Sequence, residues 1–179
     1  ITGASSGIGK ALALKFANEG WQVAASARRE SLLQDLNKTN PNIHAFPLNV
    51  TNLENTKNDF EKILKKFGSL NLCILGAAIY DPNYENEINE KKIREIMEIN
   101  FFGVVNCIKT VEKYFKIKKE GQISIISSVA GYRGLPKSEG YGASKAALNN
   151  LAESFYLDFK KHNVRISLIS PGFIKTPMT

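Results

Sequence analysis

Short apolar runs with β-strand character alternate with longer helical patterns along the whole chain of 179 residues. The runs predicted as strands are 21–27, 43–48, 70–78, 123–128 and 164–169, and Ile1 reads as the end of a further strand. The clearest helical patterns cover 8–20, 51–68, 88–118 and 141–162. Strands that alternate with helices form a parallel sheet with right-handed crossovers. The sequence therefore predicts a doubly wound α/β fold, with helices on both faces of the sheet.

A glycine-rich turn, TGASSGIG at residues 2–9, leads into the first helical pattern, which stops at Gly20. Glycines between a strand and a helix let backbone N–H groups approach a phosphate, and the dipole of the helix assists there. The spacing is G-x-x-x-G-x-G rather than the common G-x-G-x-x-G of dinucleotide folds. The turn thus indicates a phosphate site but needs support from the rest of the chain.

Arg28 and Arg29 stand at the end of the second predicted strand, 19 residues after Gly9. In a dinucleotide fold, an acidic residue at this place accepts the ribose 2′-hydroxyl of NAD, whereas arginine accommodates the 2′-phosphate of NADP. The pair therefore favours NADP over NAD. The competing interpretation is that both arginines are only the solvated entry to a helix.

Tyr141 and Lys145 are four residues apart in a predicted helix, so they share one helix face. A tyrosine hydroxyl has a pKa of about 10, and a nearby ammonium group would lower it by favouring the phenolate. Ser128 ends the preceding strand. With no histidine nearby, its hydroxyl suits hydrogen bonding to a carbonyl oxygen better than nucleophilic attack. Taken alone, Tyr141 and Lys145 could also be an aromatic ring packed on a lysine stem.

The candidate binding and catalytic residues all follow predicted strands. Parallel sheets bind their ligands at that end of their strands. These residues are the turn at 3–9, Arg28, Asn49, Ala77, Ser128 and the Pro171-Gly172 pair. Asn100 lies inside the helical pattern 88–118 between Ile99 and Phe101-Phe102, so it is expected to be buried and to need hydrogen-bond partners.

Thr51 and Glu54 have the spacing of a helix capping box.

The formal charge of +7 raises the possibility of nucleic-acid binding. The lysines, however, are spread over separate helical faces and no aromatic platform accompanies them, which argues against that class. No apolar run approaches the roughly 20 residues that span a bilayer. Cys73 and Cys107 lack metal or redox spacing and are expected to be reduced core residues, so we expect a cytoplasmic protein without a metal site.

Taken together, these residues resemble the short-chain dehydrogenase/reductase family, in its single-domain branch, over essentially the whole chain. The resemblance rests on TGASSGIG, Asn100, ISSVAG, YGASK and PGFIKT, which stand in the family's order and spacing. It implies a Rossmann-type fold with three αβα layers. It also implies an NADP(H)-dependent oxidoreductase that transfers a hydride between nicotinamide and a carbonyl or secondary alcohol.

By this resemblance Tyr141 is the catalytic acid and base, and Ser128 orients the substrate carbonyl. Lys145 binds the nicotinamide ribose and lowers the pKa of Tyr141, while Asn100 holds a water that links Lys145 to solvent. The residues expected to contact the cofactor are Gly3, Ser5, Ser6, Gly7, Ile8, Arg28, Arg29, Asn49, Val50, Ala77, Tyr141, Lys145, Pro171, Gly172, Ile174 and Thr176. The family also implies a homodimer or homotetramer that forms through helices 88–118 and 141–162.

The chain departs from the family at three places. The segment 75–78 reads LGAA where the family has Asn-Asn-Ala-Gly, which removes an asparagine that braces the sheet. Asn49 replaces a frequent aspartate but keeps an acceptor oxygen. The sequence ends at Thr179, where the family continues into a substrate lid and a last strand, and a few residues before Ile1 are also expected to be missing.

Three other readings stay open at this point. The first is an inactive or regulatory NADP-binding relative, the second a nucleotide-sugar epimerase or dehydratase, and the third a structural subunit. The physiological substrate is also open, since lipid-like ketones, steroids, sugars and polyols all fit the residues named above.

Overall fold

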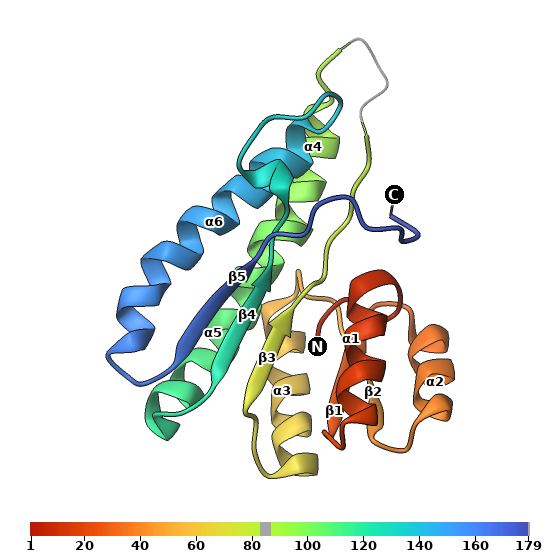
Figure 1. Ribbon diagram of the computed structural model, residues 1–179, viewed down its shortest axis with the longest axis vertical. Coiled ribbons are helices and arrows are strands. Elements are labelled where there is room, and N and C mark those ends of the chain that lie inside the picture. The colour runs from red at the N-terminus through yellow and green to blue at the C-terminus, as the bar shows by residue number, and fades with distance from the viewer. Residues whose placement is uncertain (83–86, 179) are drawn as a thin grey trace.

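The computed structural model describes residues 1–82 and 87–178, and its strands are all parallel to their neighbours. The strands are β1 (Val23–Ala27), β2 (Ile43–Pro47), β3 (Leu72–Leu75), β4 (Gln122–Ile126) and β5 (Arg165–Ile169). β1 pairs with β2, and β3, β4 and β5 pair in that order. Thr2 forms parallel bridges to both Ser26 and Leu75, and so lies between the two groups. The predicted parallel α/β fold is therefore confirmed (Figure 1).

Helices connect successive strands, as the sequence predicts. They are α1 (Gly7–Asn18), α2 (Glu30–Thr39), α3 (Leu53–Phe67), α4 (Glu90–Met97), α5 (Gly103–Lys118) and α6 (Glu139–Lys160). The sequence predicts that two helices end at Gly20 and Gly68. Both glycines adopt the left-handed conformation that ends a helix, with φ of 88° and 73°. The ends of the other elements differ from the predicted ranges by a few residues.

The capping box predicted at Thr51 is wrong by one residue. Asn52 is the N-cap of α3, and its Oδ1 accepts a hydrogen bond from the Asn55 N–H at 2.9 Å. Thr51 instead donates its hydroxyl to Asn49 Oδ1 at 3.0 Å. Asparagine caps helices at least as well as threonine does, so the chain enters the helix one residue later than the pattern indicates.

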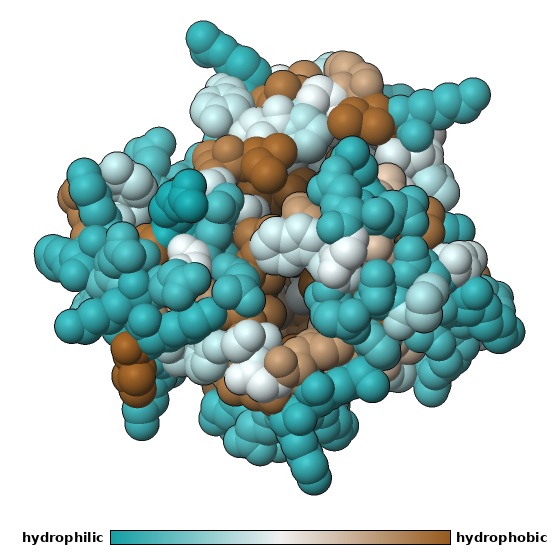
Figure 2. Space-filling model, turned by 60° about the horizontal axis from the view of Figure 1, so that its bottom comes forward, coloured by the Kyte–Doolittle hydropathy of each residue, from teal (hydrophilic) through white to brown (hydrophobic). Residues whose placement is uncertain are grey.

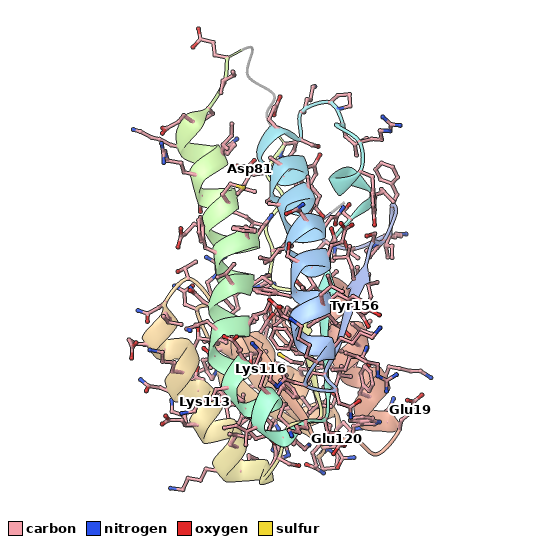
Figure 3. The ribbon with its side chains drawn as sticks, turned by 90° about the vertical axis from the view of Figure 1, so that its left-hand side faces the viewer. Glu19, Asp81, Lys113, Lys116, Glu120 and Tyr156 are labelled. Carbon is pink, nitrogen blue, oxygen red and sulfur yellow. The ribbon has the colours of Figure 1, made fainter. Side chains whose placement is uncertain are left out.

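The helical pattern predicted over 88–118 is interrupted in its middle. A π-helical turn, η1 (Glu98–Phe102), joins α4 to α5, and Asn100 lies within it. Such turns insert one extra residue into a helix and are frequent at functional sites. Figure 3 shows the joined α4–α5 rod beside α6, and α4 and η1 both contact α6.

Two groups of buried apolar side chains hold the helices on opposite faces of the sheet. The larger group joins α5 and α6 to the strands and includes Val104, Ile108, Phe115, Leu148 and Phe159. Partly buried Phe60 of α3 packs against the same group. The smaller group joins α1 and α2 to β1 and β2 through Ala13, Ala17, Ala25, Leu33 and Ile43. Both faces of the sheet are therefore covered, as a parallel sheet requires.

The face at the amino ends of the strands carries a hollow of about 470 Å³ between β1 and β3. Its lining includes Phe16, Trp21 and Phe67. Figure 2 brings this face forward and shows hydrophobic residues gathered around its hollowed centre, with hydrophilic side chains over most of the rest. None of the site residues predicted from the sequence lines this hollow.

Candidate active site

A cleft of about 690 Å³ opens at the opposite edge of the sheet, where the strands have their carboxyl ends. It collects the residues that the sequence places after successive strands. Its lining includes Gly3, Ser5, Ser6, Gly7, Ile8, Arg28, Arg29, Asn49, Val50, Ala77, Ser128, Tyr141, Lys145, Pro171, Gly172, Ile174 and Thr176. Asn100 lies outside this lining. The structure therefore gathers all the other predicted site residues around one cleft, whose size is typical of ligand pockets.

The glycine turn packs directly on the end of β3. Gly3 has a φ of 74°, and a Cβ added there would stand 2.6 Å from the carbonyl oxygen of Gly76. A Cβ on Gly9 would collide with the carbonyl group of Gly3. Glycine is therefore required at both positions by contacts with backbone, which cannot be relieved by turning a side chain. The close packing brings the start of α1 to the floor of the cleft.

The first turn of α1 lines the cleft through Gly7 and Ile8. Ser6 is its N-cap residue, but the Ser6 side chain does not cap the amides of the helix. The Ser6 hydroxyl instead accepts a hydrogen bond from Arg29 Nη2 at 2.8 Å. Uncapped amides at a helix N-terminus, together with the helix dipole, favour a phosphate or another anion.

Arg29 reaches across the glycine turn. Its Nη2 also donates to Ser5 Oγ at 2.9 Å, and its Nε approaches the same oxygen at 3.3 Å. Arg28 lines the cleft as well. The sequence predicts the two arginines as a pair, whereas the structure joins the guanidinium of Arg29 to both turn serines. A positive charge therefore lies beside the open end of α1.

The side chain of Thr2 contacts the segment that follows β3. Thr2 Oγ1 accepts hydrogen bonds from the backbone N–H groups of Gly76 and Ala77, at 3.1 and 3.2 Å. The end of β3 is thus held against the glycine turn.

Lys145 is almost fully buried, with 3% of its surface exposed. Its Nζ donates to the carbonyl oxygen of Ile126 at 2.9 Å and lies 5.5 Å from the centre of the Tyr141 ring. Burial disfavours the charged ammonium and lowers the pKa of Lys145 from 10.5 to about 8. Lys145 and Tyr141 therefore lie on the same face of α6, as predicted. The hydrogen bond also joins Lys145 to the last residue of β4.

The pKa of Tyr141 is raised above its ordinary value of 10. Burial is the largest cause, and the neighbouring Tyr80 raises the pKa further, while hydrogen bonding with Ser128 lowers it. Lys145 is not among the causes of this shift, since its ammonium is turned to Ile126, so the expected lowering of the pKa by Lys145 stays a prediction. Tyr141 consequently holds its proton at neutral pH.

Asn100 is fully buried behind the cleft, as its apolar neighbours predict. Its Oδ1 accepts from the Ile79 N–H at 2.8 Å, and its Nδ2 donates to the Ile79 carbonyl at 2.9 Å. Nδ2 also approaches Ser144 Oγ at 3.2 Å, and that hydroxyl donates to the carbonyl of Tyr141 at 2.7 Å. Asn100 thus ties the segment after β3 to the turn of α6 that carries Tyr141.

Several residues that organise the site are missed by reasoning from the sequence. Ser127 donates its hydroxyl to Asn149 Oδ1 at 2.6 Å and to the Lys145 carbonyl at 3.3 Å, and both Ser127 and Asn149 are buried. These bonds fix the residue before Ser128 against α6. Tyr80 packs edge-on against Tyr141, with ring centres 5.1 Å apart. Neither Asn149 nor Tyr80 belongs to a pattern that would mark it in the sequence.

Within residues 1–82 and 87–178, the structure has no group of three or more side chains that could hold a metal ion. Over the same residues, no helix combines the length and the apolar character needed to cross a membrane.

The sequence of the whole chain, residues 1–179, matches the short chain dehydrogenase family. The 3-oxoacyl-(acyl-carrier-protein) reductase FabG of Thermotoga maritima is 33% identical to it over 183 residues, which cover 100% of this chain and 74% of the relative. The reductase of the same name from Staphylococcus aureus is 29% identical over 184 residues, with 100% and 75% covered.

Solved structures agree with this match. The structure of ElxO with NADP bound has a TM-score of 0.91 and 30% identity, over 98% of this chain and 73% of ElxO. A short chain dehydrogenase/reductase of Burkholderia phymatum, in complex with NAD, has a TM-score of 0.94 and 26% identity, over 99% and 66% of the two chains. With its cleft, its sheet order and its sequence all in agreement, this chain belongs to the short-chain dehydrogenase/reductase family.

Proposed function

We propose that this protein is an NADP(H)-dependent oxidoreductase that acts on a carbonyl group or a secondary alcohol. The observation that carries the proposal is that Ser128, Tyr141 and Lys145 line the same cleft as the glycine turn. A phenol that keeps its proton therefore stands within the pocket whose floor is suited to a dinucleotide.

The residues present fit such a cofactor. Gly3 and Gly9 allow the turn to lie close against β3, Gly7 and Ile8 at the start of α1 line the cleft, and the Ser6 side chain does not cap the helix. Arg29 adds a positive charge at the same end. We infer that the turn and α1 hold the diphosphate, that Asn49 and Val50 flank the adenine, and that Ile174 and Thr176 flank the nicotinamide. When bound, the dihydronicotinamide supplies the hydride that adds to the carbonyl carbon.

The remaining chemistry belongs to side chains of this chain. Ser128 donates a hydrogen bond to the carbonyl oxygen, and Tyr141 donates its proton there as negative charge develops. In the reverse direction the phenolate of Tyr141 accepts the proton of the alcohol. Lys145, whose pKa is about 8, is mostly protonated at neutral pH and stabilises the phenolate. Asn100 keeps the turn of α6 in place and holds the water proposed to connect Lys145 with solvent.

The choice of cofactor is proposed from Arg29 in particular. Replacing Arg29 with alanine removes the guanidinium that spans Ser5 and Ser6. The KM for NADPH is expected to rise about 10- to 100-fold, since hydrogen bonds to a charged group contribute about 1.5–3 kcal/mol. The KM for NADH should change less than about threefold, because NADH has no 2′-phosphate.

Steady-state kinetics with both cofactors measure this difference. Arg133→Ala serves as a matched control, because Arg133 is exposed and lies outside the lining of the cleft. A parent protein that prefers NADH, or equal losses with the two cofactors, would contradict the assignment of Arg29.

A panel of carbonyl compounds tests the proposed reaction itself. The panel starts with 3-oxoacyl thioesters, the substrates named for the FabG relatives, and extends to steroid ketones, sugars and polyols. The absorbance of NADPH is followed, with NADH in parallel. We expect NADPH oxidation with at least one class. Cofactor binding without turnover across the panel would support an inactive relative instead, and isomerisation of a nucleotide-sugar without net change in NADPH would support an epimerase.

We also propose a homodimer or homotetramer, built through the α4–α5 rod and α6 as in the family. Phe102, Tyr156 and Leu157 leave large apolar surfaces exposed on these helices. Exposed apolar residues that gather on one side of a molecule mark an interface more often than isolated ones do. The mass of the protein in sedimentation equilibrium tests this, and a monomer at micromolar concentration would contradict it.

A further inference from the structure

The segment that follows β3 carries an aromatic ring into the cleft. Tyr80 comes directly after Ile79, whose N–H and carbonyl are both paired with the buried side chain of Asn100. The backbone at Ile79 is therefore fixed on two sides. Because Tyr80 is its immediate neighbour, the point from which its ring enters the cleft is also fixed.

The Tyr80 ring is held at both of its ends. It makes an edge-to-face contact with the Tyr141 ring, with ring centres 5.1 Å apart and planes inclined by 64°. Its hydroxyl accepts a long hydrogen bond from Ser138 Oγ at 3.4 Å. Ser138 is buried and is the residue before the first turn of α6, the helix that carries Tyr141. Tyr80 thus links the segment after β3 to the start of that helix.

The groups that meet Tyr141 come from three directions. Tyr80 approaches from the segment after β3, Ser128 from the end of β4, and Lys145 from the next turn of α6. Beyond Tyr80, Asp81 pairs with Lys92 of α4 at 3.1 Å, so the nearby acid has its own partner. Among these three groups, all within the described residues, Tyr80 contributes a large apolar ring without a formal charge.

We infer that Tyr80 is a positioning residue, whose ring holds the Tyr141 phenol toward Ser128 and keeps water away from it. This inference rests on the proposed role of Tyr141 in proton transfer. An edge-to-face contact fixes the orientation of a ring better than a flexible side chain would. Burial is the largest cause of the raised pKa of Tyr141, the charge interaction with Tyr80 raises it further, and the contact places the Tyr80 ring directly against the buried phenol.

The first test needs no substrate. The pKa of Tyr141 is measured by ultraviolet titration of tyrosinate, as the difference between each protein and the same protein with Tyr141→Phe. In Tyr80→Ala the pKa of Tyr141 is expected to fall, because water reaches the phenolate. Tyr80→Phe keeps the ring and removes only a hydroxyl, so its decrease should be the smaller of the two. An unchanged pKa in Tyr80→Ala would overturn the inference.

The second test follows reduction of a 3-oxoacyl thioester by NADPH. Tyr80→Ala should lower kcat about tenfold, since small displacements of a reacting group have large effects on rate. The Kd for NADPH should stay within about twofold, and Tyr80→Phe should restore most of kcat. Loss of cofactor affinity equal to the loss of kcat would point to a structural defect and overturn the positioning role.

Tyr132→Ala is the matched control, because Tyr132 is an exposed tyrosine that lies outside the lining of the cleft. It should change neither the pKa of Tyr141 nor kcat. Thermal unfolding of each variant checks that it is folded. If the parent protein reduced no carbonyl compound, the proposed function would fail, yet the titration would still decide whether Tyr80 shields Tyr141.

Discussion

Replacement of Tyr141 with phenylalanine is expected to lower kcat by about 10²- to 10⁴-fold, the contribution of a well-placed general acid. The substitution removes one oxygen and keeps the ring, so the contact with Tyr80 remains. Burial raises the pKa of the Tyr141 phenol, so the parent protein holds the proton ready at neutral pH. Without that proton, the oxygen of the reduced substrate must take one from water. The rate is measured with NADPH and the substrate that the carbonyl panel identifies.

Cofactor binding should survive the same substitution. The glycine turn, Arg29 and the start of α1 are separate from the Tyr141 hydroxyl, so the Kd for NADPH should change less than about threefold. Tyr132→Phe provides the control, because Tyr132 is an exposed tyrosine after β4 that pairs with Ser170 and lies outside the cleft lining. If Tyr141→Phe kept more than about a tenth of the parental kcat, the acid would have to be another group.

The fold could be predicted because its signals are local. Alternating apolar runs and helical patterns determine a parallel sheet with few alternatives, and Gly20 and Gly68 end their helices through a backbone conformation that favours glycine. The four-residue spacing of Tyr141 and Lys145 likewise survives in any helix. What the sequence could not supply was the direction in which Lys145 points, because its partner, Ile126, lies on a strand that is distant in the chain.

The remaining differences have the same origin. The π-helical turn around Asn100 has no periodic signal of its own, since it shifts the helical pattern by a single residue. The bond from Ser127 to Asn149 and the contact of Tyr80 with Tyr141 join segments 22 and 61 residues apart. Such contacts form only after the strands and helices are packed. Residue type and spacing identify the reacting groups, whereas tertiary contacts determine their environment and hence their pKa values.

Tyr141 and Lys145 illustrate how one helix turn can move two pKa values in opposite directions. Burial disfavours the charged form of each group, which raises the pKa of the phenol and lowers the pKa of the amine to about 8. The two groups therefore move apart in proton affinity, since the phenol holds its proton more tightly than usual and the amine releases its proton more easily. Burying the charged amine also costs the folded state free energy.

Replacement of Lys145 with methionine should reveal that cost as a gain in stability together with a loss of activity. At about 1.4 kcal/mol for each pKa unit, the decrease from 10.5 to about 8 destabilises the folded protein by about 3 kcal/mol at pH 7. Methionine keeps most of the apolar stem but leaves the Ile126 carbonyl without this donor, which costs about 1–2 kcal/mol. Unfolding by urea at pH 7 should therefore show a net gain of about 1–2 kcal/mol, while kcat/KM falls at least about 100-fold.

The dependence of this gain on pH separates the desolvated charge from a simple improvement in packing. Between pH 8 and 10.5 the unfolded chain binds more protons at Lys145 than the folded protein does, so the parent becomes more stable as pH rises through this window. Below pH 8 the full penalty is present, and above 10.5 it is gone. The advantage of Lys145→Met should therefore be largest below pH 8 and shrink or reverse toward pH 10.5. Lys160→Met, at an exposed lysine near the end of the same helix, should change stability by less than about 0.5 kcal/mol at either pH. A gain for Lys145→Met that stayed constant from pH 7 to 10 would show that its ammonium is not the source of the instability.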